Sequence, residues 1–518
     1  MRRSTPPVLN SDEMHRLETL VEEATRSTEE GVRYFIEPAE GTLRRAVSKR
    51  HHIVFGRRGS GKSSLLRKAG ADCTVSRRPI AYVDLEKFKG HSYPDVLLSV
   101  LISTFDEFKK WLETAAIYPA HKRSFWQTLF GTAPSKPTFN KKASKDLAQK
   151  IGKQIDDLLA LLHAPDESER TAIKKNSVQQ DYSVAASAGG GSSFGLEAKM
   201  GNSSAVAAEV VDSYINKKIE FLHRHLLSYQ AIFKEIARLS GGDSYLFLDD
   251  LYHIRRTDQP QVLDYFHRIA KGNNLWLKIG TIRHRSDWYV HGDPPIGLKL
   301  GDDADQIDLD VTLEKYELAK TFLLRILTNF ANEVGFKLGD FLTDGAKDRL
   351  VLASGGVARD FLSIFRGSID HARERGGGSR GEKIGAEDVN VAAGDYDTSK
   401  REEFKRDTTA DDDQLDTQYR RISEFCLEKR KANCFLLNKN ASGPAVHLIR
   451  ELVDLKLLHL VRSRVTVSKR QGEIFEAYML DLSQYAGARK RRGLSIIEFW
   501  KPKATELLRQ VSMIYEPA

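Results

Sequence analysis

A short glycine-rich stretch constrains the fold of this chain more than any other feature. Residues 56–63 read Gly-Arg-Arg-Gly-Ser-Gly-Lys-Ser and match the pattern G-x-x-x-x-G-K-[ST]. The apolar segment Ile53-Val54-Phe55 precedes the match, and Ser64-Leu65-Leu66 follows it at the start of an expected helix. A strand, a glycine-rich turn and a helix in this order are typical of the opening of a parallel α/β sheet. The sequence therefore predicts an α/β domain with a phosphate-binding loop.

Each part of this loop has a chemical role in binding a nucleoside triphosphate. Glycines let backbone N–H groups point inward at phosphate oxygens, and the helix N-terminus adds a partial positive charge. Lys62 is expected to reach the β- and γ-phosphates, and the Ser63 hydroxyl is expected to bind Mg²⁺. The residues predicted to bind the nucleotide are Gly56, Arg57, Arg58, Gly59, Ser60, Gly61, Lys62, Ser63 and Ser64.

A second part of the site is expected where another buried strand ends. Residues 244–250 read Ser-Tyr-Leu-Phe-Leu-Asp-Asp, an apolar run that suits a central strand covered on both faces. Asp249 is predicted to hold Mg²⁺ through water, and Asp250 to polarise the attacking water as a general base. The alternative is a strand that ends in an Asx turn.

Three more side chains are candidates for catalysis. Thr281 ends the expected strand 275–282 and would orient the attacking water, and Arg283 would reach a phosphate in a neighbouring subunit as an arginine finger. Residues 354–359 read Ser-Gly-Gly-Val-Ala-Arg, where the glycines end one helix and Val357 starts another. Arg359 then lies in a first turn and would point back at the nucleotide. The alternatives are a locally bonded hydroxyl for Thr281 and solvent-facing positions for the two arginines.

Residues 115–203 interrupt the α/β pattern. They contain a Lys/Ser/Pro stretch, an expected helix at 144–163 and a tract rich in Gly, Ala and Ser. Such a tract buries little apolar surface, so we expect a flexible loop or a weak hairpin, with a membrane-inserting hairpin as a minor alternative. An amphipathic helix is expected from about 205 to 239, and further helices at 313–335 and 339–372.

The positive charge of the chain is concentrated at one end. Residues 419–518 contain 19 Lys and Arg against 10 Asp and Glu, which accounts for the whole net charge of +9. The pattern of this segment is helix, short strand, helix and then two strands joined by the basic turn Ser-Lys-Arg-Gln-Gly, an order that suits a winged helix. The residues expected to contact nucleic-acid phosphates are Arg462, Arg464, Lys469, Arg470, Arg489, Lys490, Arg491 and Arg492. The alternative is a domain that contacts protein or packs on the core.

Taken in order, these motifs resemble a known family. The segment Tyr34-Phe35-Ile36-Glu37-Pro38, the phosphate loop, Asp249-Asp250, Thr281 and the Ser354–Arg359 turn are similar to AAA+/STAND ATPases, nearest the origin-recognition/initiator type. The resemblance covers about residues 31–373 without the insert. It implies a P-loop NTPase parallel sheet with a helical lid and a C-terminal winged-helix-like α+β domain, with ATP and Mg²⁺ as cofactors. It departs from the initiators at Asp250, where they usually carry Glu, and this favours slow hydrolysis or a timed switch.

The sequence pattern, together with the resemblance, gives expected domain boundaries. They are an N-terminal helical lead-in at 1–32, an ATPase core at 33–310 with the insert 115–203, a lid at 311–373, a linker at 374–417 and the basic domain at 418–518. No run of about 18 uncharged apolar residues is present. Three cysteines do not form a disulfide framework, and this is typical of a cytoplasmic protein.

Three functions remain open at this point. The first is an ATP-driven switch that binds double-stranded DNA and assembles into a homo-oligomer with ATP. The second is a signalling or defence STAND ATPase whose insert or C-terminal domain contacts a protein trigger. The third is a nucleotide-binding scaffold without turnover, for which Asp250→Ala would change nothing.

Overall fold

A five-stranded parallel sheet forms the centre of the first half of the chain. The computed structural model describes residues 8–25, 34–75, 78–117, 140–163, 195–376, 381–407, 412–486, 494–501 and 505–517. The strands lie in the order β2-β3-β4-β1-β7. Their bounds are β1 His51–Phe55, β2 Ile80–Asp84, β3 Ser244–Asp249, β4 Leu275–Thr281 and β7 Ala304–Asp308. Strand β7 and the short hairpin of β5 (Tyr289–Val290) and β6 (Ile296–Gly297) were not predicted from the sequence.

The strand order brings the predicted polar strand ends together. Strand β4 lies between β1 and β3, so Thr281 is paired in register with Phe55 at the end of β1. Strand β2 borders β3 on its other side, where Asp84 is paired with Asp249. Because all five strands are parallel, their carboxyl ends meet at one edge of the sheet, directly beside the phosphate loop.

Helices cover both faces of this sheet. Helix α3 (Lys62–Val75) and helix α2 (Thr42–Ala46) pack on one face around Val54, Leu65 and Phe247. The other face is covered by α4 (Asp95–Ile117) and α9 (Gln259–Ala270). Burial on both faces explains why β1 and β3 have no polar alternation.

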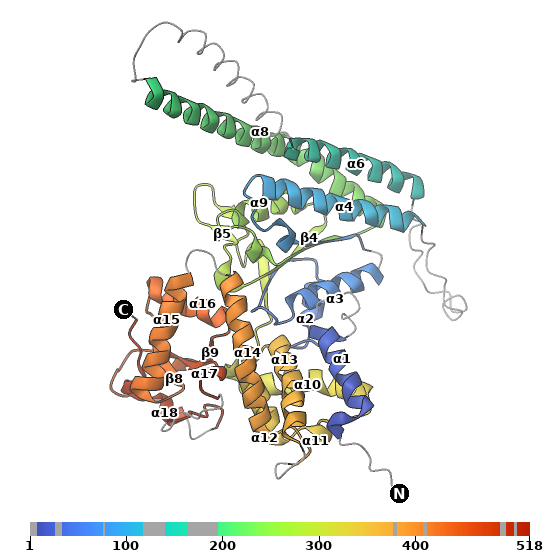
Figure 1. Ribbon diagram of the computed structural model, residues 1–518. Coiled ribbons are helices and arrows are strands. Elements are labelled where there is room, and N and C mark those ends of the chain that lie inside the picture. Colours follow the sequence, from blue (N-terminus) through green and yellow to red (C-terminus); the bar gives the residue numbers. More distant parts are fainter. Residues whose placement is uncertain are drawn as a thin grey trace, which may run out of the picture.

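The predicted insert forms a helical arm. Helix α6 (Lys141–His163) packs against α4, and the long helix α8 (Gly195–Ser240) extends away from the rest of the molecule (Figure 1). Helix α8 begins earlier than the expected residue 205, inside the tract rich in small residues; the part of the tract before Gly195 lies outside the described residues. No described helix is long and apolar enough to cross a membrane.

The lid consists of several short helices. They are α10 (Tyr316–Glu333), α11 (Leu338–Phe341), α12 (Asp344–Ala353), α13 (Ala358–Arg375) and α14 (Ala386–Asp407). The expected helical segment 339–372 comprises α11, α12 and α13. The predicted break at the glycines is confirmed, with Gly355 and Gly356 at positive φ between α12 and α13. The expected linker 374–417 contains α14, which packs on α12 and α13, so most of that segment extends the lid. Helix α1 (Asp12–Thr25) packs on α10 and α13.

The C-terminal domain is an α+β unit with a three-stranded antiparallel sheet in the order β8-β10-β9. Its strands are β8 (Cys434–Asn438), β9 (Leu458–Val465) and β10 (Phe475–Leu480). Helix α15 (Asp412–Glu424) continues into a π-helix (Phe425–Arg430), and α16 (Pro444–Asp454) joins β8 to β9. Residues 439–457 are fully described and hold this one helix, so no helix-turn-helix pair forms there.

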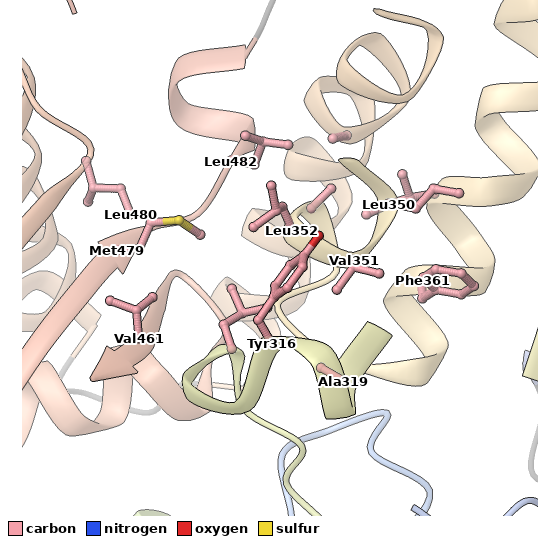
Figure 2. Close-up of a cluster of buried hydrophobic side chains, with 14 of the residues drawn as sticks. Tyr316, Ala319, Leu350, Val351, Leu352, Phe361, Val461, Met479, Leu480 and Leu482 are labelled. Carbon is pink, nitrogen blue, oxygen red and sulfur yellow. The ribbon is translucent and has the colours of Figure 1, made fainter. Parts of the chain in front are cut away.

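One hydrophobic core joins the lid to the C-terminal domain. Figure 2 shows Tyr316 of α10 and Leu352 of α12 lying opposite Val461 of β9 and Met479 of β10. The same core reaches Leu17 of helix α1. We call the set of α1, α10–α14 and the C-terminal domain the lid–C-terminal body. Its core is separate from the two cores that flank the parallel sheet.

Candidate nucleotide-binding site

A cavity of about 280 Å³ lies where the parallel sheet meets the lid–C-terminal body. The phosphate loop, the start of α3 and the carboxyl ends of β2 and β3 form one wall, and α13 with the end of α1 forms the other. The cavity is lined by these residues predicted from the sequence: Arg58, Gly59, Gly61, Lys62, Ser63, Ser64, Asp249, Asp250 and Arg359. Residues from five separate segments of the chain thus converge on one space.

The phosphate loop requires glycine at its centre. Gly59 and Gly61 have φ of 85° and 97°, a region that L-residues with side chains rarely adopt. A Cβ on Gly59 would lie 2.8 Å from the Cβ of Arg359, and the N–H of Arg359 donates to the Gly59 carbonyl at 3.2 Å. The lid therefore touches the loop directly, and only glycine permits this approach.

Lys62 is buried in the site, where opposing effects act on the pKa of its ammonium group. Its side chain is buried, and Nζ donates to the carbonyl of Arg57 at 3.4 Å. Burial lowers the pKa of Lys62, whereas the carboxylates of Asp250 and Asp249 act in the opposite direction. A triphosphate in the cavity would add negative charge beside this ammonium group and favour its protonated form.

Asp249 is fixed by hydrogen bonds on both carboxylate oxygens. One oxygen accepts from the N–H of Asp250 at 3.0 Å, and the other accepts from the hydroxyl of Tyr82 on β2. A Cβ on Gly280 of β4 would lie 2.6 Å from the Asp249 carboxylate, so a glycine at that position leaves room for the side chain. This carboxylate is therefore held in one orientation before any ligand binds.

Asp250 has a strained backbone and a shifted pKa. Its φ is 57° and its ψ is 48°, in the left-handed region, which costs a non-glycine residue about 1–3 kcal/mol. Burial, followed by the charge of Asp249, raises the pKa of Asp250 to about 7, although Lys62 opposes the shift. A carboxyl group that titrates near neutral pH is well matched to proton transfer as a general base.

Three predicted loop residues do not line the cavity. Gly56, Arg57 and Ser60 are not among the lining residues. The N–H and Nε of Arg57 both donate to Asp310, at 2.9 and 3.2 Å, and Nη2 donates to the carbonyl of Gly355 at 3.0 Å. Arg57 therefore ties the phosphate loop to the lid turn, and its side chain does not contact the nucleotide site.

Thr281 and Arg283 also lie outside the cavity lining. The Thr281 hydroxyl forms a hydrogen bond with the hydroxyl of Ser286, and both residues are buried. The guanidinium of Arg283 lies 3.9 Å from the ring centroid of Phe55 and forms an ion pair with Asp308 at 3.3 Å. Water orientation by Thr281 and contact of Arg283 with a second subunit stay predictions.

Several lining residues were not predicted. They are Ala24, Thr25, Arg67, Asp84, Glu86, Tyr252, His253, Ala358 and Leu362. Asp84 is the last residue of β2, just as Asp249 is the last residue of β3. Its place after the apolar run Ile80-Ala81-Tyr82-Val83 is a local signal that could have marked it. No local pattern marks Ala24 and Thr25, because only the packing of α1 on the lid brings them to the site.

A buried cluster of charges lies one residue beyond Arg359. Asp360 on α13 is fully buried and accepts from Nζ of Lys456 at 3.0 Å, while Lys400 of α14 lies 3.7 Å away. Lys400 also pairs with Asp481 at 2.9 Å, and Asp481 bonds to His459 at 2.8 Å. Burial alone would raise the pKa of Asp360, but the two ammonium groups outweigh it and hold the pKa below its usual value. These charges connect the lid to β9 and β10.

His459 also contacts the glycine turn that precedes α13. A Cβ on Gly355 would lie 2.1 Å from the His459 ring, and Gly355 has a φ of 58°. Gly356 is equally close to the carbonyl of Val311, where a Cβ would lie 2.0 Å from the oxygen. The Gly355-Gly356 turn is therefore enclosed by His459 of the C-terminal domain, by Val311 at the start of the lid, and by Arg57 of the phosphate loop.

Helix α16 rests on the sheet domain. Asp454 accepts from the N–H of His284 at 3.0 Å, and Arg256 lies 3.9 Å from Glu451. Burial and the nearby Asp310 carboxylate raise the pKa of Asp454 to about 7. The helix that would enter a DNA groove in a winged-helix domain is thus docked on the core in this structure.

The predicted phosphate-contacting residues of the C-terminal domain are partly described. Arg464 and Lys469 are exposed at the β9–β10 hairpin, and Arg462 is half-buried on β9. Arg470 forms ion pairs with Glu473 at 3.4 Å and Glu516 at 3.3 Å. Arg489, Lys490, Arg491 and Arg492 lie outside the described residues.

The donor set of the cavity fits a magnesium–nucleotide complex. Mg²⁺ is usually bound by one or two protein oxygens together with phosphate oxygens and water. Ser63 and the fixed carboxylate of Asp249 both line the cavity and supply such oxygens. Among the described residues, no group of three or more His, Cys, Asp or Glu side chains could hold a metal by itself.

No family model matches the chain, and no curated protein matches its sequence. Among solved structures, the chain is similar to Orc1 of Aeropyrum pernix in complex with DNA, with 14% identity and a TM-score of 0.35 over 90% of this chain and 95% of that one. It is also similar to Cdc6p of Pyrobaculum aerophilum, with 12% identity and a TM-score of 0.32 over 93% of each chain.

Both neighbours are of the origin-recognition/initiator type that the sequence motifs resemble. Both TM-scores are low, and no functional conclusion follows from either likeness.

Proposed function

We propose that this protein is a slow ATPase of the AAA+/STAND kind in which ATP controls DNA binding by the basic C-terminal domain. One observation carries the proposal: the cavity that collects the phosphate loop and two aspartates also contains Arg359 of the lid. The same lid shares its hydrophobic core with the C-terminal domain. A ligand that bridges Lys62 and Arg359 would fix the position of that domain.

The chemistry proposed for the cavity is hydrolysis of the terminal phosphate bond of ATP. Backbone N–H groups of the loop, with Lys62, bind the β- and γ-phosphates, and Arg359 neutralises the γ-phosphate from the lid side. Asp250 takes a proton from the attacking water while the bond to the leaving phosphate oxygen breaks, which releases ADP and phosphate. Magnesium held by Ser63 and Asp249 would neutralise charge on the phosphates.

The switch follows from the contacts of Arg359. Before hydrolysis this side chain would be drawn to the γ-phosphate, and after phosphate release that attraction is lost. The backbone of Arg359 is bonded to Gly59, and the next residue, Asp360, is paired with Lys456 of the C-terminal domain. Movement at Arg359 would therefore be passed to the C-terminal domain through two adjacent residues. ATP-dependent assembly with Arg283 as an arginine finger is part of this proposal.

The test measures binding of duplex DNA to the full chain with and without ATP at two salt concentrations. We expect ATP to raise the affinity and Lys62→Ala to remove the effect of ATP, while Lys68→Ala on the outer side of α3 leaves it unchanged. Lys469→Glu should lower the affinity and reduce the slope of log affinity against log salt by about 0.9.

The control for the hairpin variant is Lys501→Glu, an exposed lysine of the same domain paired with Glu498. A DNA affinity that is changed neither by ATP nor by Lys469→Glu would contradict the proposal. The docked position of α16 favours one alternative, a signalling ATPase in which the C-terminal domain contacts protein. In that case duplex DNA would not bind in any nucleotide state.

A further inference from the structure

A second cleft, separate from the nucleotide cavity, lies on the C-terminal domain. It has a volume of about 490 Å³, within the range of about 300–1,000 Å³ usual for ligand pockets. The π-helix Phe425–Arg430, the segment around Tyr515 and the β9–β10 turn enclose it. It shares no lining residue with the nucleotide cavity.

Two aromatic rings form part of the cleft lining. Phe425 and Tyr515 meet edge to face with their centroids 5.2 Å apart. The Tyr515 ring also packs against Phe435. The Tyr515 hydroxyl accepts a hydrogen bond from the side-chain amide of Gln418 at 3.2 Å. These contacts fix one aromatic ring before a ligand arrives, while Phe425 remains half-exposed. Because Tyr515 is itself buried, the ring surface open to a ligand is that of the half-exposed Phe425, which Tyr515 supports edge to face. A flat ligand ring can stack on Phe425.

The π-helix places cations beside this aromatic pair. A π-helix closes i→i+5 hydrogen bonds, so its turn is wider than an α-helical turn, and such segments occur often at functional sites. The wide turn brings both Lys429 and Arg430 to the cleft with Phe425, whereas Cys426 and Leu427 are buried on the other side. The guanidinium of Arg430 lies 5.2 Å from the Phe425 ring centroid.

The charges of the cleft favour an anionic ligand. The four basic side chains that line it outnumber the two acidic ones, Glu424 and Glu516. Arg470 is paired with Glu516, but Arg421, Lys429 and Arg430 form no ion pair within the described part of the chain. These three cations are therefore available to phosphate groups.

A nucleotide has both features that the cleft favours, a flat ring that can stack and a phosphate that can pair with cations. We propose that this cleft binds an unpaired nucleotide of single-stranded DNA. A base inside a duplex has both faces covered by its neighbours, so only an unpaired base can enter and stack. Arg470 belongs both to the cleft and to the β9–β10 turn, so the cleft is continuous with the hairpin proposed to hold duplex DNA. The inference rests on the proposed function and specifies its ligand as DNA with a duplex-to-single-strand junction.

The test compares three labelled DNAs of one sequence: a single strand, a duplex and a duplex with a single-stranded extension. Fluorescence anisotropy with the full chain should give the highest affinity for the extended duplex. Arg430→Glu should weaken single-strand binding about tenfold and reduce its salt slope by about 0.7 for the lost phosphate contact. Phe425→Leu keeps the apolar packing and should lower single-strand affinity about tenfold through lost stacking.

The matched control is Arg420→Glu, the same change at an exposed arginine on α15 that is paired with Asp416 and does not line the cleft. Equal effects of Arg430→Glu and Arg420→Glu on the single strand would overturn the inference. Displacement of the bound single strand by equimolar thymidine monophosphate or by an acidic peptide would also overturn the inference, because the cleft would then bind a free nucleotide or a protein. Thermal unfolding of each variant separates lost binding from lost folding.

The outcomes distinguish this inference from the proposed function. Duplex binding that rises with ATP, together with a single strand that does not bind, would overturn the cleft assignment alone. If single-strand binding depends on Arg430 but ATP does not change the affinity for duplex DNA, the ATP switch alone would be overturned.

Discussion

The sheet domain and the lid–C-terminal body of this chain are organised in different ways. In the sheet domain, two cores lie on opposite faces of one parallel sheet, and the functional side chains project from its edge. In the lid–C-terminal body, one core runs from α1 through the lid to the C-terminal strands, and charged groups such as Asp360 are buried within it. The lid and the C-terminal domain therefore pack as one unit, and the candidate nucleotide cavity lies at the boundary between this unit and the sheet domain.

The first prediction concerns the chemistry of the sheet side. Asp250→Asn should lower ATP hydrolysis by about 10²–10⁴-fold because the general base is lost, while ATP binding is kept. Phosphate release and nucleotide affinity are measured on the same samples, with the exposed Asp302→Asn as control. Hydrolysis that is unchanged by Asp250→Asn would show that Asp250 is not the general base. Nucleotide binding without any phosphate release from the parent protein would show a scaffold without turnover.

The second prediction concerns the stability of the other unit. Asp360→Asn should cost about 3–5 kcal/mol in the free energy of unfolding, because it leaves buried ammonium groups without their carboxylate. The matched control is Asp370→Asn on the same helix, which is exposed and should change stability by less than about 0.5 kcal/mol. Denaturant unfolding measures both. The lid and the C-terminal domain should unfold in one transition, and two separate transitions would contradict a shared core.

The third prediction concerns the Gly355-Gly356 turn of the lid, where Arg57 of the phosphate loop donates to the Gly355 carbonyl. Gly355→Ala should destabilise the protein by about 1–3 kcal/mol, because the methyl group meets the His459 ring and the residue has a positive φ. Gly339→Ala is the control, since nothing lies within 4 Å of a Cβ there. If the two units are coupled at this turn, Gly355→Ala should also weaken the effect of ATP on DNA affinity. An unchanged ATP effect would place the coupling elsewhere.

The fourth prediction concerns pH and the docking of α16. The folded pKa of Asp454, about 7, lies above the ordinary value of 3.8, so the unfolded chain ionises first as pH rises. Stability should therefore fall as pH rises from about 4 to 7, and the loss between pH 6 and pH 8 should be about 1 kcal/mol. Asp454→Asn should remove this part of the pH dependence, as measured by urea unfolding at the two pH values. An identical pH dependence in both proteins would show that Asp454 is not the responsible group.

Many of the side chains that meet in the candidate nucleotide cavity belong to motifs that the sequence marks. The loop around Lys62, the pair Asp249-Asp250 and Arg359 all line the cavity, because each is attached to a strand end or helix start that local patterns mark. Arg57 was predicted to bind nucleotide, but its guanidinium is bonded to Asp310 and Gly355. A motif gives the position of a residue along the chain, and only the packed structure determines where its side chain points.

The C-terminal domain was predicted less fully. Its strands and helices follow local hydrophobic patterns, and they lie close to the expected residues. The docking of α16 and the assignment of α14 to the lid depend on contacts between residues far apart in the chain, such as Lys400 with Asp481. The Phe425–Tyr515 cleft likewise unites segments some 90 residues apart in the sequence, and no local pattern marks such a pairing.

The α/β class, the phosphate loop, the acidic strand end and the basic C-terminal domain are all visible in the amino-acid sequence, because each depends on neighbouring residues and on a strand or helix period. The tertiary structure alone decided that the lid and the C-terminal domain share one core and that a second cleft opens beside the β9–β10 turn. Burial and close packing act between any segments that meet in space, whatever their separation along the chain.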